Sequence, residues 1–337
     1  MFKFRVTFKT MKIVKFFIFI FIFNLITFSS FAVILDGNVL DNDLAVCNNG
    51  SKASYYIKKN DPKKWAVLIK GGGAAGSDKN YLNRTQEQTK SWVKDLSMLT
   101  IKLGSITDSF NRLNYSIIYL PYCSSDVHAG THKRKIEGKD VYFHGKYIFE
   151  SLLKKYKTEL SKADDLVIGG YSAGSIAVGM NLQKIKEIKN PNTRFVLDSY
   201  WLDKSEIKPR KKLSNAKRLK YAIPNFPKDC KDWTDCYPSK KRLTKYGFKS
   251  AFIVWNEGDH FRMSKNDKRM RKYIKEDIEF FGGGISLSKD IVIPNQKSQH
   301  VILFYKPYNS IFGGIEIKKI FENWLSKNGN KTIGINF

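Results

Sequence analysis

The five residues 170–174, Gly-Tyr-Ser-Ala-Gly, constrain the fold of this chain more than any other stretch. A short apolar run at residues 166–168 precedes them like a buried strand, and the residues that follow, up to Leu182, are compatible with a helix. A Gly-x-Ser-x-Gly sequence between a strand and a helix is typical of a nucleophile elbow, a strained turn that lifts the serine hydroxyl clear of a sheet. The sequence therefore predicts that Ser172 is a nucleophile.

A nucleophilic serine needs a histidine as its base and a carboxylate that orients the histidine. In α/β-hydrolases the acid and then the histidine follow the serine, which leaves His260 and His300 as candidates. We favour His300, because His260 directly follows the best acid, Asp259, and adjacent side chains diverge on an extended backbone. Glu257 is the alternative acid. Other interpretations stay open, in which Asp259 caps a loop or helix and His300 is structural.

Acyl transfer also needs backbone amides that stabilise the developing oxyanion. Ala173, directly after the serine, is expected to supply one of them. Three glycines at residues 71–73 follow a strand-like run at 65–69, and we expect the amides of Gly72 and Gly73 to complete the oxyanion hole. The glycines could instead form a flexible turn or a dinucleotide phosphate cradle. No acidic residue ends a second strand at the distance that a dinucleotide site requires, which disfavours the cradle.

Several stretches together resemble the pectin acetylesterase and Notum family of carboxylesterases. In chain order they are Cys47 to Ser51, Tyr55 to Ile57, Trp65 to Gly73, Pro121 to Val127, Phe143 to Gly145 and Leu197 to Asp203. The resemblance covers most of the chain from Cys47 to His300, and it implies an α/β-hydrolase fold with a Ser-Asp-His triad. In this sequence the triad falls on Ser172, Asp259 and His300. The resemblance further implies a substrate pocket beside Ser124, Ser125, Asp126 and Asp198.

The chain departs from the family pattern beside the glycines. Lys70 stands where the family usually has Glu, and Ala74 and Ala75 stand where it has Trp and Cys. Backbone amides survive such changes, but the pocket wall should be wider and less aromatic. A further departure is Tyr200, where the family has Gly. These differences leave the choice of substrate open.

Strand-like and helix-like segments alternate along the chain, which predicts a mainly parallel sheet with helices on both faces. The strand-like runs lie at residues 65–69, 117–120, 166–168, 195–197, 251–254 and 290–293. Apolar residues at helical spacing predict helices around 147–156 and 317–324. The predicted fold class is α/β and α/β-hydrolase-like, as a single domain over residues 33–337. A basic, proline-containing insertion at 204–249 is expected to form a lid, with a solvated arm as the alternative.

The amino terminus predicts export. Two lysines precede an apolar stretch at residues 16–28, and residues 30–32, Ser-Phe-Ala, form a small-x-small cleavage site. Residues 1–32 therefore indicate a secretory signal peptide, whose true start could be Met11. The stretch is short for a transmembrane helix, although an uncleaved anchor is the alternative. We expect a secreted or periplasmic protein with no stable membrane insertion after signal removal.

Four cysteines in an exported chain suit two disulfides, for which three pairings are possible. Cys230 and Cys236 are close in sequence, so we expect a local bridge between them, which leaves Cys47 with Cys123. Free thiols in a reducing compartment are the alternative. No Cys-x-x-Cys or histidine cluster accompanies the cysteines, so we expect no metal and no other cofactor.

The formal net charge is +28, from 59 Lys and Arg against 31 Asp and Glu. A field of this sign would concentrate polyanions such as uronic-acid polysaccharides. Part of the lysine excess could instead reflect an AT-rich genome. No nucleic-acid recognition motif accompanies the charge, so we expect no nucleic-acid partner.

The sequence thus predicts an exported, monomeric serine carboxylesterase that removes O-acyl groups, above all O-acetyl groups, from a polysaccharide. Two other functions stay open. A Notum-like enzyme would remove a fatty acyl group from a protein or lipid, which needs a deep apolar pocket. A protein of another class would keep the fold without catalysis and bind polyanions through its basic surface.

Overall fold

The computed structural model describes residues 33–84, 89–90, 98–101, 106–199, 201, 216–217, 219–256, 259, 267–287, 300, 303–304, 311–312, 315–326 and 332–335. Several sequence predictions lie outside these residues. They concern the signal peptide at 1–32, the first part of the lid at 204–215, the strand at 290–293, and the side chains of Tyr200, Glu257 and His260.

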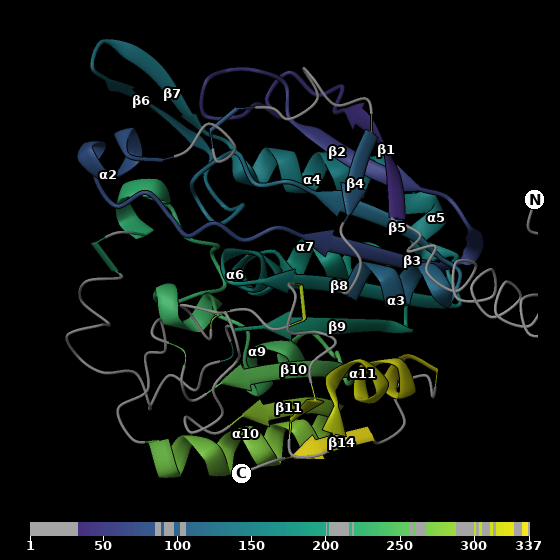
Figure 1. Ribbon diagram of the computed structural model, residues 1–337. Coiled ribbons are helices and arrows are strands. Elements are labelled where there is room, and N and C mark those ends of the chain that lie inside the picture. Colours follow the sequence, from purple (N-terminus) through teal and green to yellow (C-terminus); the bar gives the residue numbers. More distant parts are fainter. Residues whose placement is uncertain are drawn as a thin grey trace, which may run out of the picture.

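Ten of the described strands form one sheet, in the order β14-β11-β10-β9-β8-β3-β5-β2-β1-β4 (Figure 1). Their bounds are β1 (Val33–Val39), β2 (Ser54–Lys58), β3 (Asp61–Ile69), β4 (Met98–Ile101), β5 (Tyr115–Leu120), β8 (Asp165–Tyr171), β9 (Thr193–Asp198), β10 (Ala251–Asn256), β11 (Gly282–Leu287) and β14 (Thr332–Ile335). All neighbours from β14 to β5 pair in parallel, while β2, β1 and β4 add antiparallel pairs at one edge. The predicted mainly parallel sheet is confirmed.

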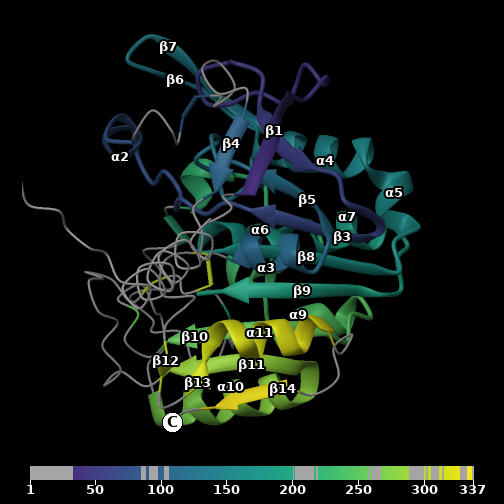
Figure 2. The same ribbon diagram turned by 45° about the vertical axis from the view of Figure 1, so that its right-hand side comes forward.

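Helices cover both faces of this sheet. One face carries α4 (Gly145–Lys155), α5 (Lys157–Ser161), α6 (Ala173–Met180), α7 (Leu182–Lys186), α9 (Lys240–Lys245) and α10 (Asp267–Phe281), whose apolar residues share one core cluster. The other carries α3 (Ile106–Arg112) and α11 (Ile317–Ser326), which contribute to a second cluster and lie together on the near side of the sheet in Figure 2. The remaining described elements are α2 (Asp78–Leu82), the hairpin β6 (His132–Ile136) and β7 (Lys139–Phe143), η3 (Trp233–Cys236), β12 (Ile311–Phe312) and β13 (Ile315–Glu316).

The central strands are apolar because both of their faces are buried. Val67 and Ile69 of β3 belong to the cluster under α4 and α6, whereas Ala66 and Leu68 belong to the cluster under α3 and α11. This alternation follows from the two-residue period of a strand. Every residue of β8, β9 and β10 is buried, as expected for parallel strands between two helical layers.

Five of the six predicted strands are confirmed, since they lie within β3, β5, β8, β9 and β10. The predicted helical stripes at 147–156 and 317–324 correspond to α4 and α11. The strand β11 was missed because it opens with three glycines, which have low strand preference. A Cβ atom at Gly283 would lie 2.4 Å from the Trp324 ring, so the glycine allows α11 to pack directly on the strand.

Two disulfides join the four cysteines. Cys47 pairs with Cys123, and Cys230 pairs with Cys236, so the predicted pairing is confirmed. Both bridges fit a protein that folds in an oxidising compartment. In the part of the chain that the structure describes, no helix is long and apolar enough to cross a membrane.

Candidate active site

Ser172 occupies a strained turn between β8 and α6. Its φ is 52° and its ψ is −121°, a conformation that costs free energy for any residue except glycine and is typical of functional sites. The Ser172 N–H donates to the carbonyl of Asp198 at 2.9 Å. A Cβ atom at Gly174 would lie 2.2 Å from the carbonyl oxygen of Ile69, so only glycine fits there. The turn therefore has the geometry of a nucleophile elbow.

A second serine supports this turn. The Ser175 hydroxyl lies 2.6 Å from the carbonyl of Gly170 and 3.0 Å from the carbonyl of Asp198, both of which accept from it. It thereby connects the first turn of α6 to the ends of β8 and β9. Ser172 is partly exposed, whereas Ser175 is fully buried. The two serines therefore have different surroundings, and only Ser172 is open to a substrate.

His300 and Asp259 lie together although 41 residues separate them. The His300 Nδ1 atom lies 2.6 Å from Asp259 Oδ2, and the two side chains are 11% and 5% exposed. Asp259 follows β10, at the same edge of the sheet as the ends of β8 and β9. With Nδ1 donating to the carboxylate, Nε2 is the ring nitrogen that is left to accept a proton. This arrangement suits an oriented general base.

Asp198 connects the serine turn to the segment after His300. Its main-chain carbonyl accepts from the Ser172 N–H, and its Oδ2 accepts from the Leu303 N–H at 2.7 Å. Asp198 lies at the end of β9 and is fully buried. The chain thus places both segments against one carboxyl-terminal strand end. That Ser172, Asp259 and His300 work as a triad stays a prediction.

The glycine loop after β3 passes beside Ser172. A Cβ atom at Gly71 would lie 2.9 Å from the Ser172 Cβ atom, and one at Gly72 would lie 2.4 Å from the Tyr122 ring. Gly73 has a φ of 69°, which favours glycine. Ala173, the first residue of α6, is buried. The roles of the Gly72, Gly73 and Ala173 amides as oxyanion donors stay a prediction.

The four residues expected at the substrate pocket are fully buried. They are Ser124, Ser125, Asp126 and Asp198, each with 0% exposure. The Ser124 hydroxyl donates to Asp126 at 2.5 Å, and the Ser125 hydroxyl donates to Asn48 at 2.6 Å. Such contacts hold loops together beside the predicted site. A direct contact with substrate stays a prediction that this burial does not support.

Two ionisable side chains in the loop after β5, those of Asp126 and His128, have shifted pKa values. Burial raises the pKa of Asp126 to about 6, although the Ser124 hydroxyl and the N–H groups of Gly145, Gly130 and His128 all donate to it. Burial lowers the pKa of His128 to about 4, so its ring is neutral at physiological pH. The His128 Nε2 atom lies 3.1 Å from the carbonyl oxygen of Lys70, directly before the glycine loop.

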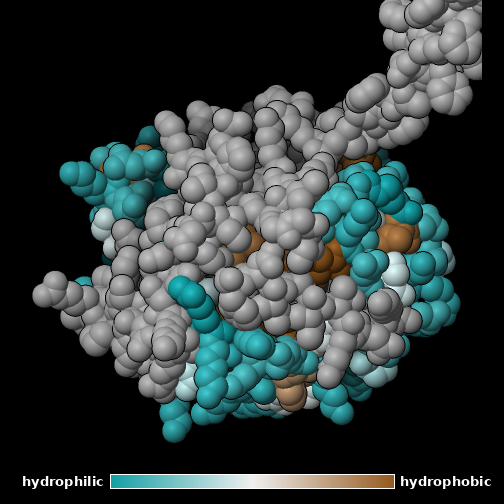
Figure 3. Space-filling view, turned by 60° about the horizontal axis from the view of Figure 1, so that its bottom comes forward, coloured by the Kyte–Doolittle hydropathy of each residue, from teal (hydrophilic) through white to brown (hydrophobic). Residues whose placement is uncertain are grey.

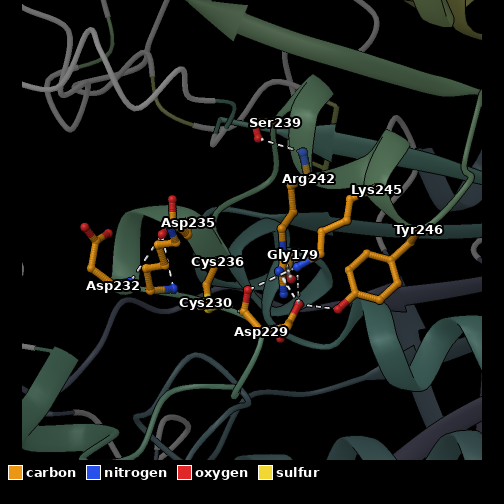
Figure 4. Close-up of polar contacts among 11 residues, drawn as sticks. Gly179, Asp229, Cys230, Asp232, Asp235, Cys236, Ser239, Arg242, Lys245 and Tyr246 are labelled. Atoms are coloured by element: carbon orange, nitrogen blue, oxygen red, sulfur yellow. Dashed lines mark hydrogen bonds and ion pairs between the residues drawn. A yellow bond between two sulfur atoms is a disulfide. The ribbon is translucent and has the colours of Figure 1, made fainter.

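Residues 229–246 of the predicted lid are fastened to the far end of α6 (Figure 4). Arg242 donates from Nη1 to the Asp229 carboxylate and from Nε to the carbonyl of Gly179 at 3.1 Å, and Tyr246 also donates to Asp229. A Cβ atom at Gly179 would lie 2.4 Å from the carbonyl oxygen of Cys236. These contacts attach the segment that contains the Cys230–Cys236 bridge to the helix that begins after Ser172. Its role as a lid stays a prediction.

A cavity of about 1010 Å³ lies at this end of α6, lined among others by Met180, Lys184, Phe226 and Asp229. Its described lining includes neither Ser172 nor Asp259 nor His300. Among the described residues, no group of three or more His, Cys, Asp or Glu side chains could hold a metal ion. The expectation that the protein needs no metal stays a prediction.

Residues 31–256 match the family model described as pectinacetylesterase. The chain belongs to the pectinacetylesterase family. The predicted enzyme class agrees with this membership, because the family is one of carboxylic ester hydrolases. The match includes the glycine loop and Ser172 and ends before Asp259.

Curated relatives of the chain carry the name palmitoleoyl-protein carboxylesterase. NOTUM of Schmidtea mediterranea is 28% identical over 213 residues, which are 55% of this chain and 40% of that protein. The notum1a protein of Danio rerio is 27% identical over 223 residues, 61% of this chain and 41% of that protein. The chain thus spans less than half the length of these relatives. The structure of the Wnt deacylase Notum from Drosophila has the same fold, with a TM-score of 0.65 at 20% identity over 90% of this chain and 97% of that one.

Sequence reasoning missed Ser175, Tyr122 and His128 as supports of this site. Tyr122 lies within a stretch that resembles the family, but the stretch alone does not say what its hydroxyl contacts. Ser175 directly follows the Gly-x-Ser-x-Gly motif, and its position in the first turn of the helix is the sequence signal that could have indicated a supporting role.

Proposed function

We propose that this protein is an exported serine carboxylesterase that removes O-acetyl groups from a polysaccharide. The observation that carries the proposal is the hydrogen bond between His300 and Asp259, because an imidazole held by a carboxylate is the kind of oriented base that a nucleophilic Ser172 would need. Membership in the pectinacetylesterase family supports the type of bond that is cleaved. Two disulfides and an expected signal peptide support a location outside the cytoplasm.

In the proposed reaction, the Ser172 hydroxyl oxygen attacks the ester carbonyl carbon while His300 Nε2 takes the hydroxyl proton. The amides of Gly72, Gly73 and Ala173 stabilise the oxyanion, and Asp259 stabilises the charged imidazole ring. The C–O bond to the sugar then breaks, and His300 returns the proton to the leaving sugar oxygen. Water attacks the acetyl-serine with His300 again as base, which releases acetate and restores Ser172.

The side chains beside the glycine loop give no positive sign of the deep apolar pocket that a fatty acyl group needs. Ala74 and Ala75 follow the glycines, and Ala75 is fully buried, so neither supplies an aromatic wall for a long chain. A fatty acyl ester is the second candidate substrate, because the names of the curated relatives specify a palmitoleoyl group on a protein. The net charge of +28 supports an acidic polysaccharide as the acetylated polymer.

The proposal is tested by comparing the hydrolysis of p-nitrophenyl acetate and p-nitrophenyl octanoate by the wild type and Ser172→Ala. We expect the wild type to prefer acetate, and the variant to lose activity by about 10³-fold or more, because no other group replaces the nucleophile. Equal rates for both proteins would end the enzyme hypothesis in favour of a binding protein. A preference for octanoate would favour the fatty acyl ester.

The same assay checks the choice of base. His300→Ala should lose about as much activity as Ser172→Ala, since serine and histidine act as a unit. His260→Ala is the matched control and should keep most of its activity. An inactive His260→Ala beside an active His300→Ala would assign the base to His260.

A further inference from the structure

Two buried aromatic side chains of the loop after β5 hold the glycine loop beside Ser172 in place. The Tyr122 hydroxyl donates to the carbonyl of Gly73, and His128 Nε2 lies 3.1 Å from the carbonyl oxygen of Lys70. The two rings contact each other, with centroids 4.7 Å apart. Both residues are almost fully buried, at 0% and 1% exposure. The carbonyl of Lys70, just before the glycines, therefore contacts the His128 ring, and the carbonyl of Gly73, the last glycine, contacts the Tyr122 hydroxyl.

The Tyr122 hydroxyl also holds its own loop. It accepts from the Val127 N–H at 2.7 Å while it donates to Gly73. Close by, the Ala75 N–H donates to the carbonyl of Ser125 at 2.8 Å. Ala74 and Asp126 thereby form an antiparallel bridge. One hydroxyl thus fixes two main-chain segments that lie about 50 residues apart in the sequence.

Fixing a carbonyl also fixes the amide that follows it. The carbonyl of Gly73 and the N–H of Ala74 belong to one planar trans peptide group and point in opposite directions. Tyr122 holds the carbonyl, so the Ala74 N–H is directed away from the Tyr122 hydroxyl. The ring also contacts Gly72, where a Cβ atom would lie 2.4 Å from it. Gly73, whose own N–H is one of the expected oxyanion donors, therefore lies between two points that Tyr122 holds, with the ring against Gly72 and the hydroxyl at the Gly73 carbonyl. The carbonyl of Gly72, which shares a peptide group with the Gly73 N–H, accepts from Arg84 Nη2 at 2.7 Å.

The loop that carries Tyr122 and His128 is itself rigid. Ser125, Val127 and His128 have φ values of 57°, 49° and 55°, which are uncommon for residues other than glycine. The Asp126 carboxylate accepts from three main-chain N–H groups and one hydroxyl, and Cys123 is joined to Cys47. A strained but heavily bonded loop is suited to hold a neighbour in one orientation.

We propose that Tyr122 is a positioning residue for the oxyanion hole, whose hydroxyl keeps the amides of the glycine loop directed at the oxyanion. Tyr122 does not touch the substrate in this proposal. Its effect on the reaction passes through the position of Gly73, so it acts on transition-state stabilisation and not on substrate binding. The inference rests on the proposed esterase function of the same site.

The experiment compares the wild type with Tyr122→Phe on p-nitrophenyl acetate and on its thiono analogue, in which sulfur replaces the carbonyl oxygen. Sulfur accepts hydrogen bonds weakly, so the oxyanion amides contribute little to hydrolysis of the thiono ester. We expect kcat for the oxygen ester to fall about 10-fold with KM nearly unchanged, and kcat for the thiono ester to fall less than about 3-fold. The ratio of the oxygen rate to the sulfur rate should therefore decrease.

Tyr156→Phe is the matched control. It also removes a buried tyrosine hydroxyl, which here donates to Tyr55 in the core under α4. This control should leave the rate ratio at the wild-type value. Because both rates are measured on one sample, the ratio does not depend on the folded fraction, and a destabilised variant still reports it.

An equal fall in both rates would show that Tyr122 only supports the fold, and an unchanged kcat would show that the hydroxyl has no role. Either result overturns the inference while Ser172-dependent hydrolysis stands. Equal rates for the wild type and Ser172→Ala would instead defeat the proposed function, and the inference would fall with it.

Discussion

At the scale of single residues, His128 and Asp126 should respond to acid in opposite directions. Burial lowers the pKa of His128 from the ordinary 6.5 to about 4. Between these pH values this histidine is protonated in the unfolded chain and neutral in the folded one, so its contribution to stability falls as the pH falls. Burial puts the pKa of Asp126 at about 6, above the ordinary 3.8, so between these values only the folded chain binds a proton and stability rises as the pH falls. The two effects offset each other between about pH 6 and pH 4.

Replacing Asp126 should expose the effect of His128. We expect Asp126→Asn to lose about 3 kcal/mol more stability than the wild type between pH 6.5 and pH 4, measured by urea unfolding at each pH. Any constant loss from the altered hydrogen bonds cancels in this comparison of slopes. His128→Gln is the opposite control, and its stability should rise relative to the wild type over the same interval. Parallel pH profiles for Asp126→Asn and the wild type would contradict the prediction.

The residues that could be predicted from the sequence are those whose roles are local or ordered along the chain. Ser172 and its glycines form a contiguous motif, and the order of acid and histidine selected a pair that the structure joins by a hydrogen bond. Tyr122 could not be predicted as a support of Gly73, because the contact joins loops after two different strands. The family resemblance places three further residues beside the predicted site, but only the fold shows that they are buried. They are Ser124, Ser125 and Asp126.

At the scale of elements, α6 is fixed at both of its ends. Its first turn is bonded to the end of β9 through Ser175, and its last turn is bonded to Arg242 through the carbonyl of Gly179. Arg242 is only 4% exposed and forms an ion pair with Asp229, which is 19% exposed. The described part of the insertion is therefore a support of the nucleophile helix as well as the segment expected to form a lid.

Removing this arginine should destabilise the protein strongly. We expect Arg242→Ala to cost about 3 kcal/mol in the free energy of unfolding, because it leaves the mostly buried Asp229 carboxylate without its main partner. Lys272→Ala is the control for loss of an exposed pair, since Lys272 lies 3.9 Å from Glu276 with side chains 78% and 50% exposed, and it should cost less than about 0.5 kcal/mol. Similar unfolding midpoints for the two variants in urea would show that the clamp at Asp229 does not stabilise the fold.

The sequence predicts strands correctly where they are continuous apolar runs. It does not predict strands that open with glycine or that lie at the antiparallel edge of the sheet. The strands β8, β9 and β10 are recognisable because both faces are buried. In β11, glycine makes room for Trp324 and Phe252, and this packing is invisible in a local pattern. The antiparallel edge strands β1 and β4 pair with each other across about 65 residues, which no local signal specifies.

At the scale of the whole molecule, the formal net charge is strongly positive. On the face drawn in Figure 3, most described residues are hydrophilic and hydrophobic residues show only in small areas. The formal net charge of +28 would attract a polyanion over distances of about 10 Å at 0.1 M salt, and salt would weaken the attraction. A neutral polymer or a small ester would not experience it.

The positive charge therefore predicts that KM depends on salt concentration for an acidic acetylated polymer and not for a neutral one. If the substrate is an acidic polysaccharide, KM for acetylated polygalacturonate should rise about 10-fold between 0.05 and 0.5 M sodium chloride, because screening reduces its concentration near the protein. KM for an acetylated neutral glycan and for p-nitrophenyl acetate should change less than about 2-fold, which controls for effects of salt on the chemistry. Acetate release is measured for each polymer. An equal response of acidic and neutral polymers would mean that the lysine excess does not select the substrate, and it would leave the choice to contacts beside Ala74 and Ala75.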